Sequence, residues 1–159
     1  AGTPTAASEA AMAITIPAAS LTGGTEVTVT ANANAKFAIT AADAASATVG
    51  DVTVEGTVNQ AITDAEVTIT LANDTFKAAM AANDDVSGWF NLPAGLTAKV
   101  KTATEAEATS VTVTIAGTPT AASEAAMAIT IPADNLTGSK AVTVTENTNA
   151  KYAITEVTA

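Results

Sequence analysis

The sequence predicts an all-β fold in which antiparallel sheets pack as a sandwich and the sandwich recurs in tandem. Three observations lead to this prediction. Apolar and Thr residues alternate along short segments, Gly and Pro residues fall between those segments, and the opening of the chain returns near its end. Alternation with a period of two indicates strands with one buried face, because successive side chains of a strand point to opposite sides. Turn residues at regular spacing between such strands are typical of sandwiches.

The returning segment is long and close in sequence. Residues 1–40 and 116–155 align at a constant offset of 115 and differ at 8 of 40 positions. The stretch AGTPTAASEAAMAITIP is identical in both copies. A repeat this close indicates duplicated structural modules. We therefore expect the chain to hold one full period and the beginning of another, within a longer array.

At least six short strands are expected from the alternation. Thr residues on the outward faces fit a solvated sheet surface, because β-branched side chains favour extended backbone. Turns are expected at Gly56, Gly95, Gly117 with Pro119, Pro132 and Gly138. The inward-facing positions are, in chain order, Val52 and Val54; Val67, Ile69 and Leu71; Val111, Val113 and Ile115; Met127, Ile129 and Ile131; Val142 and Val144; Tyr152 and Ile154.

One stretch departs from the period of two. Asn73 or Asp74 is a good helix N-cap, and Phe76 and Met80 form an apolar pair four residues apart, so we expect a short helix over 75–82. The prediction is thus a sandwich with a short helical insertion around 74–90. The apolar residues that close this loop, Trp89, Phe90 and Leu92, are expected to cover an open end of the core.

Composition excludes several classes of function. The formal net charge is -10 with six Lys and no Arg, which disfavours nucleic acid and anionic membrane surfaces as partners. Without Cys or His the chain lacks a disulfide framework, the usual zinc ligands and the usual proton shuttle. No run of about 18 apolar residues occurs, so no membrane insertion is expected in this segment.

Two motifs carry a resemblance to a known family. LPAGLT at 92–97 is followed by IAGTPTAA at 115–122, a pair that resembles the LPAGL…GTPTAA signature of the putative Ig family of bacterial surface proteins. The resemblance implies Ig-like, cadherin-like β-sandwich repeats. It covers about residues 48–155 and recurs over 2–40. The insertion at 73–90 departs from simple members and leaves the strand order open.

On this resemblance, residues 47–159 form a complete repeat and residues 1–46 are the C-terminal half of a preceding one. Such a half would expose apolar strand edges, and unpaired edges recruit other strands. The exposed positions would be Met12, Ile14, Ile16, Val27 and Val29. Either an upstream half completes them, or another chain does so by strand addition, which would make a filament. A domain running from Ala1 to about Ile115 is a circularly permuted alternative.

Candidate site residues are few. Calcium binds six to eight oxygens, and cadherin-like arrays hold it between domains, so Asp84 and Asp85 are weak calcium candidates. No spaced Asp-x-Asp-x-Asp motif with Gly supports them, and the alternative is that they cap a turn. Trp89 and Phe90 are weak ligand-binding candidates. One Trp and one Tyr give few sugar platforms for a carboxylate pair, so we expect no enzyme, no catalytic residue and no cofactor.

The sequence therefore favours a structural repeat module of a bacterial cell-surface or extracellular fibrous protein, such as a stalk, a filament or a surface-layer spacer. Its expected partners are neighbouring copies of the same repeat or chain, in a homopolymer or a tandem array. The alternative is an adhesin module that binds a glycan or a host protein through the loop at 84–92. An acidic, Thr-rich surface suits either extracellular role by keeping the array soluble.

Overall fold

The chain is all-β in the computed structural model, which describes residue 4 and residues 6–157. It divides into two compact units, Ala1–Asp43 and Ala44–Ala159. The regular structure of both units consists of strands, most of them antiparallel, and short 3₁₀ turns, which confirms the predicted all-β class. The sequence placed the boundary after residue 46, and the first strand of the second unit begins at Ser46.

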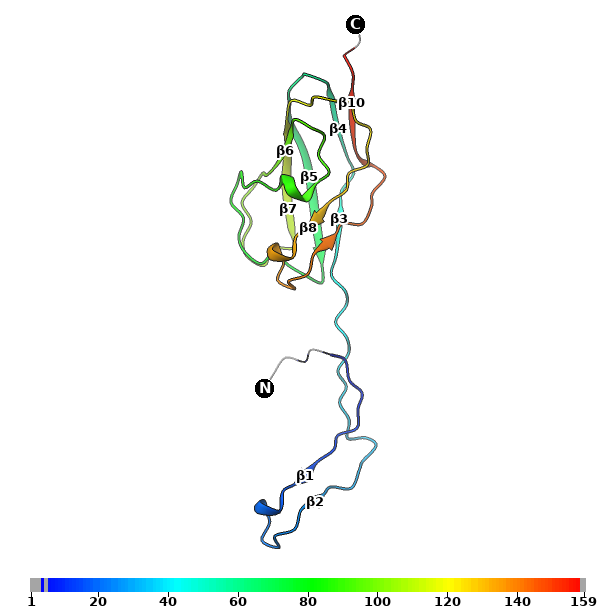
Figure 1. The fold of residues 1–159 in the computed structure, drawn as a ribbon, viewed down its shortest axis with the longest axis vertical. Coiled ribbons are helices and arrows are strands. Elements are labelled where there is room, and N and C mark those ends of the chain that lie inside the picture. Colours follow the sequence, from blue (N-terminus) through cyan, green and yellow to red (C-terminus); the bar gives the residue numbers. More distant parts are fainter. Residues whose placement is uncertain (1–3, 5, 158–159) are drawn as a thin grey trace. The chain divides into compact units, whose positions relative to one another are not determined.

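The second unit contains a four-stranded antiparallel sheet and two further strand pairs (Figure 1). The sheet has the order β3-β5-β7-β6, formed by β3 (Ser46–Val49), β5 (Ile62–Ala72), β7 (Ser110–Gly117) and β6 (Leu96–Val100). The two pairs are β4 (Val52–Thr57) with β10 (Ala150–Thr155), and β8 (Thr130–Ile131) with β9 (Val142–Thr143). Of these strands, β3 and β6 were not predicted.

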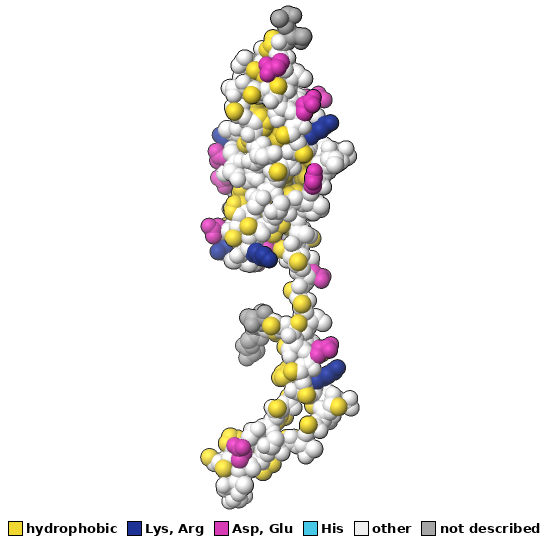
Figure 2. All heavy atoms as spheres, turned by 45° about the vertical axis from the view of Figure 1, so that its right-hand side comes forward, with side chains coloured by type: hydrophobic (Ala, Val, Ile, Leu, Met, Phe, Trp, Pro, Cys, Tyr) yellow, Lys and Arg dark blue, Asp and Glu magenta, His cyan; other side chains and the backbone are white. Residues whose placement is uncertain are grey.

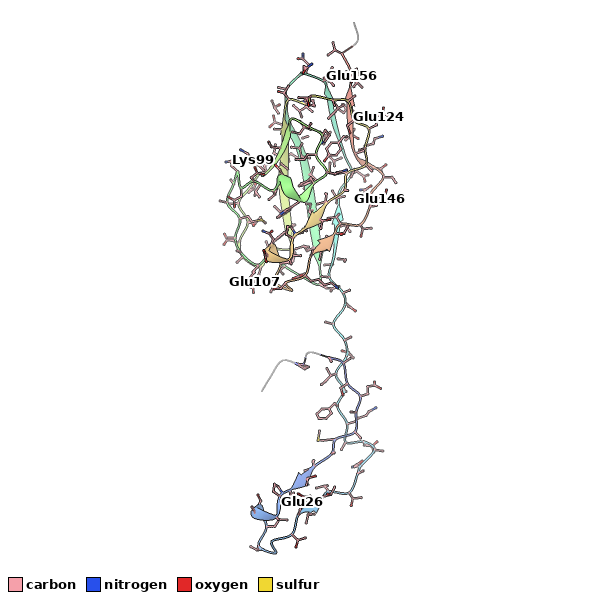
Figure 3. All side chains as sticks on the ribbon, in the orientation of Figure 1. Glu26, Lys99, Glu107, Glu124, Glu146 and Glu156 are labelled. Carbon is pink, nitrogen blue, oxygen red and sulfur yellow. The ribbon has the colours of Figure 1, made fainter. Side chains whose placement is uncertain are left out.

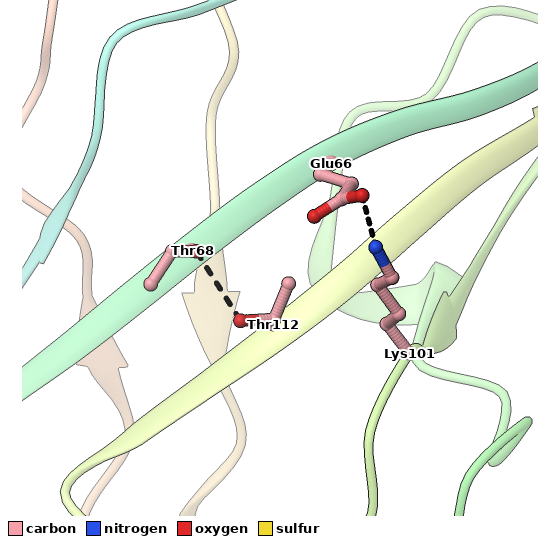
Figure 4. A network of polar contacts seen from close by, with 4 residues as sticks. All are labelled: Glu66, Thr68, Lys101 and Thr112. Atoms are coloured by element: carbon pink, nitrogen blue, oxygen red, sulfur yellow. Dashed lines mark hydrogen bonds and ion pairs between the residues drawn. The ribbon is translucent and has the colours of Figure 1, made fainter.

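Alternation along β5 and β7 separates a buried face from a solvated one. Val67 lies opposite Val113 and Ile69 opposite Val111, and all four side chains are buried. On the other face the hydroxyls of Thr68 and Thr112 lie 3.3 Å apart, and Lys101 pairs with Glu66 (Figure 4). Both members of this ion pair are about half exposed, so the outer face carries solvated polar pairs that stabilise the fold little.

The remaining strands close the core from the other side. β4 and β10 are parallel over six registered pairs, from Val52 with Ala150 to Thr57 with Thr155. Ala47 of β3 bridges Val144 in parallel, which links the four-stranded sheet to the segment after β9. Tyr152, Ile129, Ile131 and Ile154 from these strands are almost completely buried against the inner face of the sheet.

The helix predicted over 75–82 is wrong. Phe76 and Met80 instead make isolated β-bridges, with Leu136 and Thr104, and both are buried. A spacing of four residues also fits extended backbone, in which every second side chain shares a face. The N–H of Phe76 donates to Ala108 O at 2.9 Å, so the backbone bonds across loops and not within a helical turn. Helix within 74–90 is confined to a 3₁₀ turn, η2 (Ser87–Trp89).

The conformations of Gly95 and Gly117 show why the two sequence motifs contain glycine at these positions. Their φ angles are +90° and +133°, and the N–H of Thr118 donates to Gly95 O at 3.0 Å. A Cβ on Gly95 would overlap the carbonyl oxygen of Thr118, and one on Gly117 would overlap that of Gly95. The motifs therefore form one joint where β6 starts and β7 ends, and both glycines are needed for backbone approach and for positive φ.

The first unit repeats the local structure of the C-terminal part of the second unit, at the offset of 115. β1 (Thr15–Ile16) pairs with β2 (Val27–Thr28) in the register of β8 and β9. A 3₁₀ turn follows a proline in both places, η1 (Ala18–Ser20) in the first unit and η3 (Ala133–Asn135) in the second. The bridges of Ser8 with Ile39 and of Ala11 with Lys36 also recur, as Ser123 with Ile154 and Ala126 with Lys151.

Burial differs sharply between these two copies. Met12, Ile14, Val27, Val29 and Phe37 are 38–48% exposed. Their equivalents Met127, Ile129, Val142, Val144 and Tyr152 are 0–7% exposed. No described residue of the first unit is buried. The predicted exposure is confirmed for Met12, Ile14, Val27 and Val29, while Ile16 is partly covered.

The two isoleucines at equivalent positions give a matched test of burial. We expect Ile129→Ala to lower the free energy of unfolding of the second unit by about 2–5 kcal/mol, because it leaves a cavity in a packed core. Ile14→Ala should change it by less than about 0.5 kcal/mol. Denaturant titration followed by the fluorescence of the single Trp, Trp89, reports on the second unit alone. Equal losses in both variants would contradict the assignment of the core.

Tyr152 provides a second test because its hydroxyl is buried without a hydrogen-bond partner. Burial raises the pKa of Tyr152 above its ordinary value of 10.0, so its neutral form stabilises the fold at lower pH and that stability is lost as pH rises above about 10. Tyr152→Phe, which places the residue of the first copy here, should raise the free energy of unfolding by about 1 kcal/mol at neutral pH. It should also flatten the alkaline decline. A loss of stability at pH 7 would indicate a hydroxyl partner.

Candidate interaction surfaces

The loop at 81–92 holds all four candidate site residues, and its first part is fixed by its own side chains. Asp84 Oδ2 accepts the N–H of Ala81 at 2.7 Å, which closes a turn. The carbonyl of Asp84 accepts the N–H of Val100 at 2.9 Å, and the N–H of Asn83 donates to Val100 O at 2.8 Å. These bonds pin the loop to β6.

Asp85 has a similar capping role. Its Oδ1 accepts the N–H of Ser87, the first residue of the 3₁₀ turn η2, at 2.8 Å. Hydrogen bonds from the backbone and side chain of Ser87 hold the pKa of Asp85 below its usual value, and the charge of Lys99 adds to them. Asp85 bridges Lys99 of β6 through the backbone. The structure thus gives both carboxylates the turn-capping contacts that the sequence offered as the alternative to calcium.

Among the residues that the structure describes, no group of three or more His, Cys, Asp or Glu side chains lies close enough to hold a metal ion. Calcium needs six to eight oxygens, and one oxygen of each carboxylate already accepts an amide proton. The contacts that the structure gives Asp84 and Asp85 are thus those of turn caps.

Trp89 and Phe90 face the core. Trp89 is 6% exposed and stacks on Phe76, with ring centroids 6.0 Å apart and planes inclined by 6°. Phe90 is 9% exposed and bridges Ile129 through the backbone. Both rings belong to the buried cluster, so they offer little surface on which a sugar or a peptide could stack.

Two polar side chains, those of Asp74 and Asn91, join the two parts of the second unit. We name these parts the covering half (residues 44–117) and the returning half (residues 118–157). Asp74 Oδ1 accepts the N–H groups of Thr75 at 2.8 Å and Gly138 at 2.9 Å. The sequence suggested capping by Asp74 but placed it at a helix. The side chain of Asn91 donates to Ala126 O at 2.9 Å and accepts the N–H of Ala128 at 2.8 Å. No sequence pattern marked Asn91.

The largest exposed apolar side chains belong almost entirely to the first unit. Five of the six described ones lie there, and hydrophobic side chains reach the surface of this unit in Figure 2. We name the set the open face. Its members are Met12, Ile14, Val27, Val29 and Phe37. Exposed large apolar side chains that gather on one unit are typical of an interaction site.

Charged side chains are spread over the second unit. Lys99, Glu107, Glu124, Glu146 and Glu156 lie apart from one another in Figure 3. The described residues contain one ion pair, Lys101 with Glu66. No helix among the described residues is long and apolar enough to cross a membrane.

Comparison of the chain with protein-family models, with curated proteins and with solved structures finds no match.

Gly138 and Gly23 allow a matched test of the contact with Asp74. A Cβ on Gly138 would lie 2.8 Å from Asp74 Oδ2, whereas a Cβ on Gly23 would meet nothing within 4 Å. We expect Gly138→Ala to lower the free energy of unfolding by about 1 kcal/mol, because it displaces the carboxylate from two amides. Gly23→Ala should leave it within about 0.5 kcal/mol. Thermal unfolding followed by Trp89 fluorescence measures both; a neutral Gly138→Ala would show that the contact is dispensable.

Proposed function

We propose that the chain is a structural repeat module of a bacterial cell-surface or extracellular fibrous protein, a stalk, a filament or a surface-layer spacer. The observation that carries this proposal is that one sequence segment occurs twice, at an offset of 115 residues, and adopts the same strand register and the same 3₁₀ turn both times. Near-identical modules in series add length, which is what a stalk or spacer needs.

The finer architecture belongs to the same proposal. We infer tandem Ig-like sandwiches, in which the four-stranded sheet and the β4–β10 layer enclose one core. Support comes from the buried inner faces of β5 and β7, the burial of Tyr152 opposite them, and the joint of Gly95 with Gly117. That joint contains the two motifs on which the family resemblance rests.

The rival role, an adhesin module acting through residues 84–92, has weaker support. Asp84 and Asp85 accept amide protons of their own loop, and Trp89 and Phe90 are buried. Aromatic and charged side chains that bind a partner must be free to contact it. The contacts of this loop favour a packing role, and a packing role fits a spacer.

The proposal is tested by lengthening the array with its own sequence. Appending residues 45–159 after Ala159, once and then twice, adds 115 residues each time. Because a linear array keeps its cross-section, we expect the cross-sectional radius of gyration from small-angle X-ray scattering to stay constant. The maximum dimension should rise by the same increment with each addition. A compact particle whose cross-section grows with each copy would contradict a fibrous role.

The adhesin role is tested on the same proteins with a glycan array and a panel of extracellular matrix proteins. We expect no saturable binding that depends on residues 84–92. The matched variants are Asp84→Ala with Asp85→Ala, and Asp64→Ala as an acidic control outside the loop. Binding that the first pair abolishes and the control retains would replace the structural proposal with recognition.

A further inference from the structure

The open face of the first unit has the residues and the local structure of a face that is buried elsewhere in the same chain. Ile14 and Val29 are 47% and 44% exposed, whereas Ile129 and Val144 are 1% and 7% exposed. The strand registers of the two copies are the same. The copies therefore differ in what covers them and not in how they fold locally.

Every segment that covers the returning half comes from residues 44–117. Val54 of β4 lies beside Tyr152, Ala47 of β3 bridges Val144, and Phe90 bridges Ile129. Hydrogen bonds follow the same division. Thr145 N–H donates to Ala47 O at 2.8 Å, and Thr137 N–H donates to Thr75 O at 3.0 Å. The covering half supplies both apolar surface and backbone partners.

Substitutions between the two copies avoid the buried positions. The described residues of 116–155 include ten buried positions, and nine of them carry the same residue in the first copy. The tenth is Tyr152, replaced by the similar ring of Phe37. Six of the 8 differences fall at exposed positions of the second unit: Asp134, Ser139, Lys140, Ala141, Glu146 and Thr148. The first copy keeps the pattern of a covered surface.

Gly23 points to the same conclusion independently. Its equivalent, Gly138, lies against the Asp74 carboxylate and has no room for a Cβ. Gly23 has open space around it, yet it is also glycine. A glycine here leaves room for a carboxylate like that of Asp74, and without such a neighbour it only adds to the entropy lost on folding.

The count of covering halves and returning segments in one chain indicates which segment can cover the open face. Each chain carries one covering half and two segments of the returning type, residues 1–40 and 116–155. The covering half is already used by the returning half of its own unit. Any number of identical chains that exchange strands would still leave one open face per chain. A second copy of this chain therefore cannot satisfy the open face by strand exchange.

We propose that the open face is the docking surface for a further segment with the sequence type of residues 44–117, belonging to a repeat that precedes Ala1 in the same polypeptide. The alignment provides the connection. Ala1 and Gly2 align with Ala116 and Gly117, the last residues of β7, so a preceding β7 would continue directly into the first copy. Each folded module then consists of the covering half of one sequence period and the returning half that follows it. This inference rests on the proposed tandem array.

The test compares the chain of 159 residues with a chain in which residues 44–115 are placed directly before Ala1. Hydrogen exchange read by mass spectrometry follows peptides from residues 8–39 and, as an internal standard, the equivalent peptides from 123–154. In the 159-residue chain the first set should exchange rapidly. In the extended chain its amides should slow by at least about 100-fold, approaching the internal standard.

A matched control uses the same extension with Val54→Asp in the added copy only. Val54 is fully buried beside β10, so a charge there should prevent docking and leave residues 8–39 unprotected. Gly23→Ala provides a second arm. It should be silent in the 159-residue chain and should reduce protection of residues 8–39 in the extended chain, because only there does an Asp74-like carboxylate meet it.

Three results would overturn the proposal. The first is rapid exchange of residues 8–39 in the extended chain while residues 44–157 stay protected. The second is equal protection by the Val54→Asp extension. The third is protection of residues 8–39 in the 159-residue chain itself, which, with a dimeric mass by light scattering, would make a second copy the occupant. That arm needs no extended protein, so the proposal can be overturned even if the extension does not fold.

These outcomes are separate from those that test the fibrous role. Slow hydrogen exchange of residues 8–39 reports on docking, whether or not the array lengthens regularly or binds a glycan. An array that bound glycans through residues 84–92 would fail the fibrous proposal and still show this protection. An array that lengthened regularly without it would keep the fibrous role and refute the docking.

Discussion

Two-sided burial is the constraint on which the rest of this structure depends. Two strands of the returning half, β8 and β9, have only two residues each, and the equivalent strands of the first unit bury no side chain without a partner layer. Apolar burial contributes about 25 cal/mol per Å² of surface removed from water, so a strand pair alone cannot offset the entropy of ordering its backbone. The same segment appears both with and without its partner layer in this chain, and its side chains are buried only with it.

How well the structure of each segment could be predicted depended on the pattern of apolar residues in that segment. Val67, Ile69, Val111 and Val113 alternate cleanly and lie in long strands, so their inward direction could be predicted. The stretch 75–82 misled because a spacing of four is shared by helices and extended chains, and only its cross-loop hydrogen bonds decide between them. The parallel pairing of β4 with β10 was unpredictable, since alternation marks a buried face but not the neighbouring strand.

The candidate sites were harder to predict for a related reason. In a sequence, an Asp that caps a turn cannot be told from an Asp that binds a cation. Only the hydrogen bonds from the N–H groups of Ala81 and Ser87 assign Asp84 and Asp85 to capping. Trp89 and Phe90, which were expected to cover an open end of the core, are buried. Asn91, which holds Ala126 and Ala128 together, gave no signal because its partners lie about 35 residues away in sequence. Four of the five residues of the open face, Met12, Ile14, Val27 and Val29, were predicted from the repeat, whereas Phe37 was not.

The parallel pairing of β4 with β10 has a mechanical consequence. One strand lies near the start of the second unit and the other at its end, and both run in the same direction over six pairs. Tension applied through the two chain ends would pull on opposite ends of this ladder, so its hydrogen bonds would be loaded together in shear and not broken one after another. The β4–β10 ladder, which joins the two halves, would then resist stretching. Its hydrogen bonds would break before the module extends.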